Sequence, residues 1–352
     1  MDGCIHCQNT IPMEQGGTMI ISADSNKLFT IIKETFTRHN IKFQLRRLNI
    51  LIPYDYIRQL QSLTELLQDT LSQKERHSLR GNIINEKNIP DMVMFPLYSY
   101  EEIEQRILNP AYVKIIQEQH FTSHMQPIFC TQEESVYGYE FLLRPSREDF
   151  PFYPGELFSF SRRSGMHSML DSQARINAIR TGSEKLGEEE MLFINFLPSS
   201  IYDPAHCLKS TFEAVDTYQV NPKRLVFEVV ETEQIHDMTH LKTIFHEYQK
   251  SGVKVALDDI GSGFATNDVL QELRPDYAKI DRQIIQNCHL DENKLETIEE
   301  ISRVSKEQGT FLLAEGIENK AEYMAVKKLV DYCQGYYFAK PEKDPYVSYS
   351  LR

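Results

Sequence analysis

VKVALDDIGSGFATNDVL, residues 253–270, carries the clearest signal of the fold of this chain. An apolar, β-branched run leads into two adjacent acids, a glycine-rich turn and the start of a helical pattern. A buried strand followed at once by a loop and a helix is typical of one unit of a parallel α/β sheet. In such a fold the same unit should recur on either side of this stretch.

Similar runs alternate with helical segments from Gln126 onward. They are VYGYEFLL (136–143), MLFINFL (191–197), RLVFEVV (224–230), DYAKID (276–281), TFLLAE (310–315) and LVDYC (329–333). So many units predict a closed barrel rather than an open sheet. The first strands, from MQPIF across TQEES to VYGYEFLL, form a hairpin-like start and should pair antiparallel. The expected fold is an α/β, modified TIM (β/α)8 barrel with an antiparallel strand, over residues 125–352.

A different pattern precedes the barrel. Residues 1–17 have no periodicity and form an irregular leader that contains Cys4-x-x-Cys7. Residues 18–95 follow the order strand, helix, strand, strand, helix, strand, with the second helical stretch running from Asp55 to about Leu79. This order suits a split βαβ, ferredoxin-like sandwich, a small α+β domain. It holds no cluster of catalytic residue types, so we interpret it as regulatory, joined to the barrel by a helical linker over 96–124.

The composition argues against several classes of function. The formal net charge is −13, which argues against binding DNA or RNA through the phosphate backbone. No run reaches the roughly 18 apolar residues of a membrane span, and the chain lacks a secretory signal, so we expect no membrane segment and a cytoplasmic location. The six cysteines are scattered and are expected to be reduced thiols. Whether Cys4 and Cys7 bind a metal stays open, because a structural zinc needs four ligands.

Polar and charged side chains stand at or just after the ends of the predicted barrel strands, and once within the first. They are Glu140, Asn195, Glu228, Asp258, Asp259, Lys279, Asp281, Glu315 and Gln334. Parallel strands of a barrel end at one mouth, so these side chains should converge. Converging carboxylates repel one another unless cations neutralise them, which predicts a divalent metal site. The oxygen-rich ligand set suits Mg²⁺ or Mn²⁺.

Each of these residues alone also has an ordinary interpretation. A single acid at a strand end usually caps a helix or is solvated. Asn195, inside an apolar run, could be satisfied by backbone groups, and Asp258 with Asp259 before Gly261 could form a simple turn. Lys279 would be costly to bury as a charge unless acidic partners surround it, and the proposed mouth supplies them.

Eight pieces in order resemble the EAL family of bacterial cyclic di-GMP phosphodiesterases, over about residues 126–341. The pieces are MQPIF, GYEFLLRP, FINFLP, FEVVETE, VALDDIGSGFATNDVL, RPDYAKIDR, LLAEGIEN and CQGYYFAKP. The chain departs from the family pattern at Phe141, where the signature has alanine, and at Ile260 and Asn267. The resemblance implies a modified (β/α)8 barrel, hydrolysis of cyclic di-GMP to linear pGpG and a two-metal site.

The resemblance also implies individual roles. Metal ligands would be Glu140, Asn195, Glu228, Asp258 and Asp259, with Asp258 bridging two ions. Lys279 would contact the attacking water, Glu315 would act as the general base, and Glu231 would anchor the loop after Asp258. Positions in or around the substrate site would be Gln126, Leu142, Arg144, Asp281, Glu318, Gln334 and Pro341. A homodimer through the barrel is also implied.

Two other functions remain open at this point. One is a receptor that binds cyclic di-GMP without hydrolysing it and signals through the N-terminal domain. The other is a barrel enzyme that acts on a different phosphate ester. Turnover of the cyclic dinucleotide, with and without a chelator, distinguishes the three.

Overall fold

The computed structural model describes residues 16–86, 96–229, 238–261 and 266–346. The expectations for Cys4, Cys7 and Glu231 therefore lie outside the described residues. The chain forms two compact units, one made of Met1–His120 with Arg147–Leu170 and the other of Phe121–Ser146 with Asp171–Arg352. No helix among the described residues is long and apolar enough to cross a membrane.

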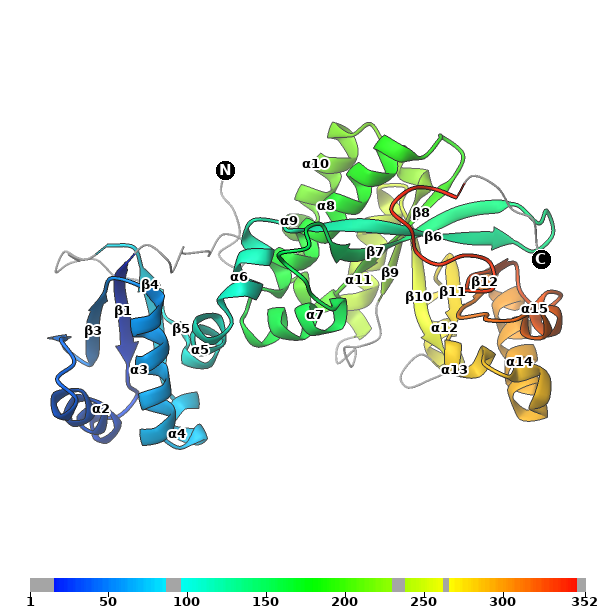
Figure 1. Ribbon diagram of the computed structural model, residues 1–352. Helices are drawn as coiled ribbons and strands as arrows, with labels where there is room; N and C mark the ends of the chain where they lie inside the picture. Colours follow the sequence, from blue (N-terminus) through cyan, green and yellow to red (C-terminus); the bar gives the residue numbers. More distant parts are fainter. Residues whose placement is uncertain (1–15, 87–95, 230–237, 262–265, 347–352) are drawn as a thin grey trace. The chain divides into compact units, whose positions relative to one another are not determined.

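The first unit contains a five-stranded antiparallel sheet in the order β2-β3-β1-β4-β5 (Figure 1). Its strands are β1 (Gly17–Ser22), β2 (Gln44–Arg46), β3 (Asn49–Tyr54), β4 (Arg80–Ile84) and β5 (Tyr98–Ser99). The helices among and after them are α2 (Asn26–Arg38), α3 (Ile57–Thr70), α4 (Gln73–His77), α5 (Tyr100–Leu108), α6 (Pro110–Gln117) and α7 (Pro154–Arg163). The predicted small α+β domain is confirmed, with β5 added to the expected strands.

The helices of this unit follow from their sequences. The Ser25 side chain caps α2 by accepting from the Leu28 amide at 3.3 Å, and the apolar face of α2 is buried. The long helix expected from Asp55 to Leu79 is in fact two helices. Leu71 leaves the helical conformation, and Ser72 with Glu75 forms a capping box that starts α4.

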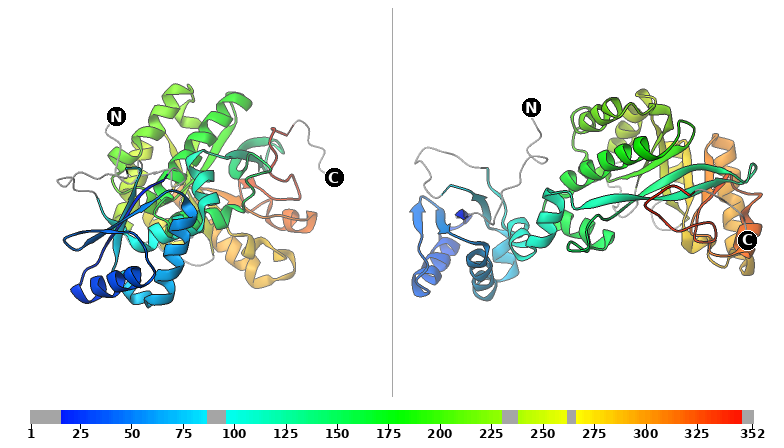
Figure 2. Two further views of the ribbon diagram at one scale, coloured as in Figure 1. Left: turned by 60° about the vertical axis from the view of Figure 1, so that its left-hand side comes forward. Right: turned by 45° about the horizontal axis from the view of Figure 1, so that its top comes forward.

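The second unit is built on a closed eight-stranded barrel in the order β10-β11-β12-β13-β6-β7-β8-β9. The strands are β6 (Phe121–Cys130), β7 (Val136–Pro145), β8 (Met191–Phe196), β9 (Leu225–Val229), β10 (Lys254–Ile260), β11 (Tyr277–Ile280), β12 (Phe311–Ala314) and β13 (Tyr332–Cys333). β6 pairs antiparallel with both β7 and β13, and the other pairs are parallel. β6 and β7 lie side by side as long strands in every view (Figure 2). The predicted modified TIM barrel with an antiparallel strand is confirmed.

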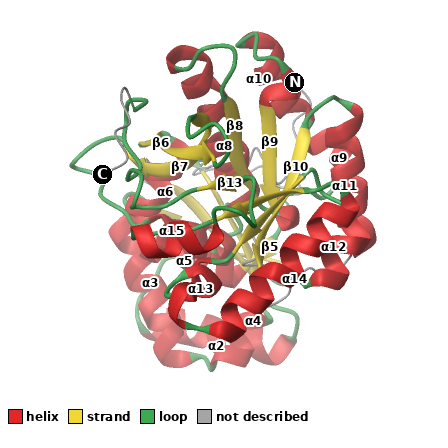
Figure 3. Ribbon diagram, turned by 90° about the vertical axis from the view of Figure 1, so that its right-hand side faces the viewer, coloured by secondary structure: helices red, strands yellow, loops and turns green. Residues whose placement is uncertain are grey.

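Helices surround the barrel strands (Figure 3). They are α8 (His167–Lys185), α9 (Pro204–Cys207), α10 (Lys209–Thr217), α11 (Met238–Lys250), α12 (Asn267–Leu273), α13 (Arg282–Ile285), α14 (Glu292–Gln308) and α15 (Lys320–Val326), with short 3₁₀ turns at Pro198–Ser200, Pro222–Arg224 and Cys288–Leu290. One apolar cluster fills the space between strands and helices. A second, smaller cluster contains Phe193, Val226, Ala256, Tyr277 and Leu313, one from each of five strands. Alternate side chains of these strands therefore face the barrel interior.

Candidate active site

The polar residues of the mouth stand one pleat above the apolar interior cluster. Side chains of a strand alternate between its two faces, so residues two apart share a face. Six residues of the interior cluster are each followed two positions later by a predicted site residue: Phe193 by Asn195, Val226 by Glu228, Ala256 by Asp258, Tyr277 by Lys279, Leu313 by Glu315 and Tyr332 by Gln334. In β6, which runs the opposite way, Gln126 precedes Ile128 by two. The barrel therefore has an apolar floor under a polar layer.

Lys279 lies among four carboxylates of this layer. Its Nζ atom is 2.8 Å from Glu228 Oε2, 3.5 Å from Asp258 Oδ1 and 3.8 Å from Glu140 Oε2. It also makes a close ion pair with Glu315. The Lys279 side chain is 1% exposed, so these acids supply the countercharge that a buried ammonium requires.

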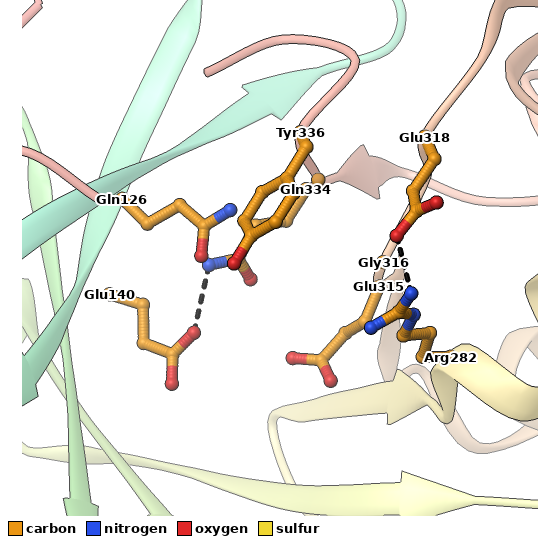
Figure 4. A pocket seen from close by; sticks show the side chains of 9 residues that line it. Gln126, Glu140, Arg282, Glu315, Gly316, Glu318, Gln334 and Tyr336 are labelled. Atoms are coloured by element: carbon orange, nitrogen blue, oxygen red, sulfur yellow. Dashed lines mark hydrogen bonds and ion pairs between the residues drawn. The ribbon is translucent and has the colours of Figure 1, made fainter. Parts of the chain in front are cut away.

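Two amides fix the position of Glu140. Asn195 Nδ2 donates to Oε1 at 2.9 Å, and Gln334 Nε2 donates to Oε2 at 2.8 Å. Figure 4 shows the Gln334 contact and shows Glu140 and Glu315 facing a common space. Asn195 also stands opposite Glu228 in the β8–β9 register. The structure thus brings together Glu140, Asn195, Glu228, Asp258, Lys279, Glu315 and Gln334.

The adjacent acids Asp258 and Asp259 sit at an irregularity in β10. The register with β11 shifts between Leu257 and Ile260, and Asp259 has φ of 55°, in the left-handed region. In a regular strand, neighbouring side chains would point to opposite faces. Here Asp258, Asp259 and Glu315 each offer an oxygen atom within 4.8 Å of the others. The bulge therefore allows both acids to reach one site.

The electrostatics of the mouth reflect crowding of buried acids. Burial raises the pKa of Glu228, Glu315 and Asp258, neighbouring carboxylates add to this rise, and Lys279 opposes it. Burial, followed by the charges of Asp258 and Asp281, raises the pKa of Asp259 to about 7. For Lys279, burial lowers the pKa but the surrounding acids outweigh it, so the pKa is raised well above its ordinary value. Lys279 therefore does not by itself neutralise the acids of the mouth.

The donor set fits a divalent cation. Glu228 Oε1 is buried and, among the described residues, has no hydrogen-bond partner. An orphaned carboxylate oxygen is costly unless something else occupies its lone pairs. Together with the oxygen atoms of Asp258, Asp259 and Glu315, it offers the hard ligands that Mg²⁺ and Mn²⁺ prefer.

A cavity of about 170 Å³ opens beside these acids. Its lining includes the predicted residues Gln126, Glu140, Glu315, Glu318 and Gln334, and also Gly316, Gly335, Arg282 and Tyr336 (Figure 4). Arg282 forms an ion pair with Glu318 and adds a cation that the sequence reasoning missed. Tyr336, 55% exposed, was missed as well. Both lie next to predicted motif residues, at Asp281-Arg282 and Gln334-Gly335-Tyr336, and this adjacency is the signal that could have identified them.

Four predicted substrate residues do not line this cavity. Arg144 donates to the carbonyl of its neighbour Leu143 at 2.8 Å, and Asp281 caps the start of α13. Leu142 lies in β7 and is half-buried, and Pro341 lies beside Glu342, which pairs with Met125 of β6. These four positions are therefore not part of the cavity wall.

A buried ion pair supports the chain just after Asn195. Asp171 Oδ1 accepts from the Leu197 amide at 2.9 Å, and Asp171 also pairs with Arg175 of the same helix. The side chains of both are 3% exposed or less. Arg175 Nε in turn donates to Thr211 Oγ1 at 3.2 Å. The turn that follows β8 is therefore held by α8.

Comparison with known proteins identifies the barrel region. The family model described as EAL domain matches residues 107–341, more than half of the chain. Cyclic di-GMP phosphodiesterase PdeL of Escherichia coli K12 is 26% identical over 67% of this chain and 66% of its own length. The chain thus spans slightly less than two thirds of that relative.

Solved structures agree on the fold. A standalone EAL protein from Vibrio cholerae O395, in its c-di-GMP-bound form, is 32% identical with a TM-score of 0.58, covering 64% of this chain and 93% of that one. Klebsiella pneumoniae BlrP1, in a calcium and cyclic di-GMP complex, is 17% identical with a TM-score of 0.59. That match covers 93% of this chain and 97% of the other, so the similarity of fold extends beyond the barrel.

Proposed function

The chain belongs to the EAL domain family, and from this premise we propose that it is a metal-dependent phosphodiesterase that hydrolyses cyclic di-GMP to linear pGpG. The observation that supports this most directly is the polar layer of the barrel mouth. It carries acids from separate strands around Lys279, with an orphaned oxygen on Glu228 and the Asp258, Asp259 and Glu315 group next to a cavity.

The residues of the mouth suit the reaction. Glu228, Asp258 and Asp259 would hold Mg²⁺ or Mn²⁺, with Glu140 and Asn195 completing the ligand set. When bound, such ions lower the pKa of water and stabilise charge on the attacked phosphate. Glu315, whose pKa is raised by burial, would accept a proton from the attacking water.

Lys279 and Arg282 would counter the negative charge of the substrate. Lys279 Nζ is fixed by its acidic neighbours and would stabilise charge that develops on the phosphate oxygens. Arg282, held by Glu318 at the cavity wall, would attract a phosphate group as it enters. Water adds to phosphorus, one phosphodiester P–O bond breaks, and the proton accepted by Glu315 is returned to the leaving oxygen or to solvent.

The test is a turnover assay on the full chain. Purified protein is incubated with cyclic di-GMP and Mn²⁺ or Mg²⁺, with chelator in a parallel sample, and the nucleotides are separated by chromatography. We expect pGpG only in the presence of metal. Glu140→Gln should lower the rate by about 10²–10³-fold, the range seen when one group that stabilises a transition state is removed. Glu307→Gln, an exposed acid on α14, serves as the matched control and should leave the rate unchanged.

The same assay distinguishes the alternatives. Binding of cyclic di-GMP without product would favour a receptor, and hydrolysis of bis-p-nitrophenyl phosphate without hydrolysis of cyclic di-GMP would favour another phosphate ester. Either result would overturn the proposed activity. A homodimer through the barrel, a cytoplasmic location and a lack of DNA or RNA binding stay predictions from the sequence. Light scattering, which measures the molar mass in solution, tests for the homodimer.

A further inference from the structure

A second cavity, of about 840 Å³, lies in the N-terminal unit, far larger than the one at the barrel mouth. It is formed by the turn after α2, the end of β3 and the first half of α3. Its volume falls within the roughly 300–1,000 Å³ of small-molecule sites in proteins. Nothing in the proposed phosphodiesterase reaction uses it.

The cavity has an apolar floor. Ile41 and Leu66 line it with partly exposed side chains, and beneath them lie Ile52, Leu60 and Leu63, which are no more than 4% exposed. Tyr54, at the end of β3, also lines the cavity.

The Tyr54 hydroxyl is an unmet hydrogen-bonding group in this cavity. Tyr54 is 2% exposed, and its Oη has no hydrogen-bond partner among the described residues. A buried hydroxyl without a partner costs free energy, which a ligand that accepts its hydrogen bond would recover. Burial raises the pKa of Tyr54 to about 12, so the hydroxyl is protonated at neutral pH and is able to donate.

The rim of the cavity is cationic, although the whole chain carries a net charge of −13. Lys42 and Arg58 line it with exposed side chains, and Asp55 is the single carboxylate among the described residues of the lining. His39 and Tyr56 are further exposed members of the rim. Exposed cations at the entrance of an apolar cavity favour ligands that are anionic at one end.

We propose that this cavity is a binding site for a small organic anion with an apolar body. The body lies against Ile41 and Leu66, an acceptor atom of the ligand meets the Tyr54 hydroxyl, and the anionic group faces Lys42 and Arg58. The site is separate from the barrel mouth, and its occupancy is measurable whether or not the chain hydrolyses a nucleotide.

The experiment uses the full chain and two fluorescent probes, 8-anilinonaphthalene-1-sulfonate and the uncharged N-phenyl-1-naphthylamine. The two share an aromatic body, but only the first carries an anion. The chain contains no tryptophan, so Tyr56→Trp places a single emitter at the rim. We expect saturable binding of the sulfonate at one site, with energy transfer that quenches this tryptophan. Leu48→Trp, an exposed position in the same unit beside the opposite end of β3, is the control emitter and should be quenched less.

Charge reversal tests the rim. Lys42→Glu with Arg58→Glu should weaken sulfonate binding by at least about tenfold, because two attractive charges become repulsive, and should leave the uncharged probe unaffected. Lys33→Glu, an exposed cation of α2 outside the lining, is the matched control and should bind the sulfonate as the parent does. Circular dichroism of each variant verifies that the unit stays folded.

Three results would overturn the proposal. They are the absence of saturable sulfonate binding, equal affinity for the charged and uncharged probes, and equal loss of affinity in the rim variant and the Lys33→Glu control.

Discussion

Replacing Asp258 by Asn should uncouple the stability of the barrel from divalent metal. In the parent chain, an ion at 100 times its dissociation constant adds about 2.7 kcal/mol. For a unit of this size, that corresponds to a rise in Tm of about 5–10 °C. Asp258 supplies one of three oxygen atoms that lie within 4.8 Å of one another. If the loss of this carboxylate weakens the binding of the ion a hundredfold, the stabilisation by metal falls to about 0.4 kcal/mol, which corresponds to a Tm shift of about 1 °C.

Without metal, the Asp258→Asn variant should be at least as stable as the parent chain. Burial and nearby acids raise the pKa of Asp258, which means that its charged form is disfavoured where it stands. The uncharged amide removes that penalty, so in chelator the Tm should equal or exceed that of the parent. A general loss of structure would instead lower the Tm under both conditions.

The assay is thermal unfolding followed by circular dichroism, first in chelator and then in Mn²⁺ or Mg²⁺. Asp216→Asn, an exposed acid at the end of α10, makes the same chemical change away from the mouth and should keep the full metal-dependent shift. The reasoning is refuted if Asp258→Asn retains that shift, or if the parent chain shows none.

Three further outcomes are expected from urea unfolding in chelator. Lys279→Met should cost about 3–5 kcal/mol, because it leaves Glu228 and its neighbours buried without a cation, and a cost below about 1 kcal/mol would contradict the ion-pair geometry. Tyr54→Phe should leave stability unchanged or raise it by about 1–2 kcal/mol, since it removes a buried hydroxyl without a described partner, and a clear loss would indicate that the hydroxyl is already paired. Asp171→Asn should cost about 3–5 kcal/mol by stranding buried Arg175, and an unchanged midpoint would exclude the pair as a support.

The barrel and its polar mouth could be predicted because both depend on local patterns. β-branched runs alternate with helical segments, and each run ends in a residue such as Asn195 or Glu228 that is out of place in an apolar strand. Closure of parallel strands then brings these ends together whatever the details of packing. The individual roles of these residues come from the family resemblance rather than from the pattern.

Other features depend on geometry that no local pattern encodes. The two amides that hold Glu140 come from Asn195 and Gln334, which are 139 residues apart, so their contact exists only after the barrel closes. Arg282 is a common residue type in a plausible helix start, and only its pairing with Glu318 shows that it lines the cavity. The sequence pattern does not predict the break at Leu71, because leucine favours a helix. The capping box of Ser72 and Glu75 nevertheless starts a new helix directly after it.

The layered interior has a consequence for how this barrel tolerates change. Apart from Asp259, which the irregularity of β10 redirects, each reactive side chain keeps its direction only while an even number of positions separates it from the apolar residue beneath it. Unless such a bulge absorbs it, the loss or gain of one residue within a strand would turn every later side chain of that strand to the opposite face, so that apolar side chains would replace the acids at the mouth. The strands should therefore accept swaps of one hydrocarbon side chain for another but no change of length, so insertions and deletions would have to fall in the loops and helices.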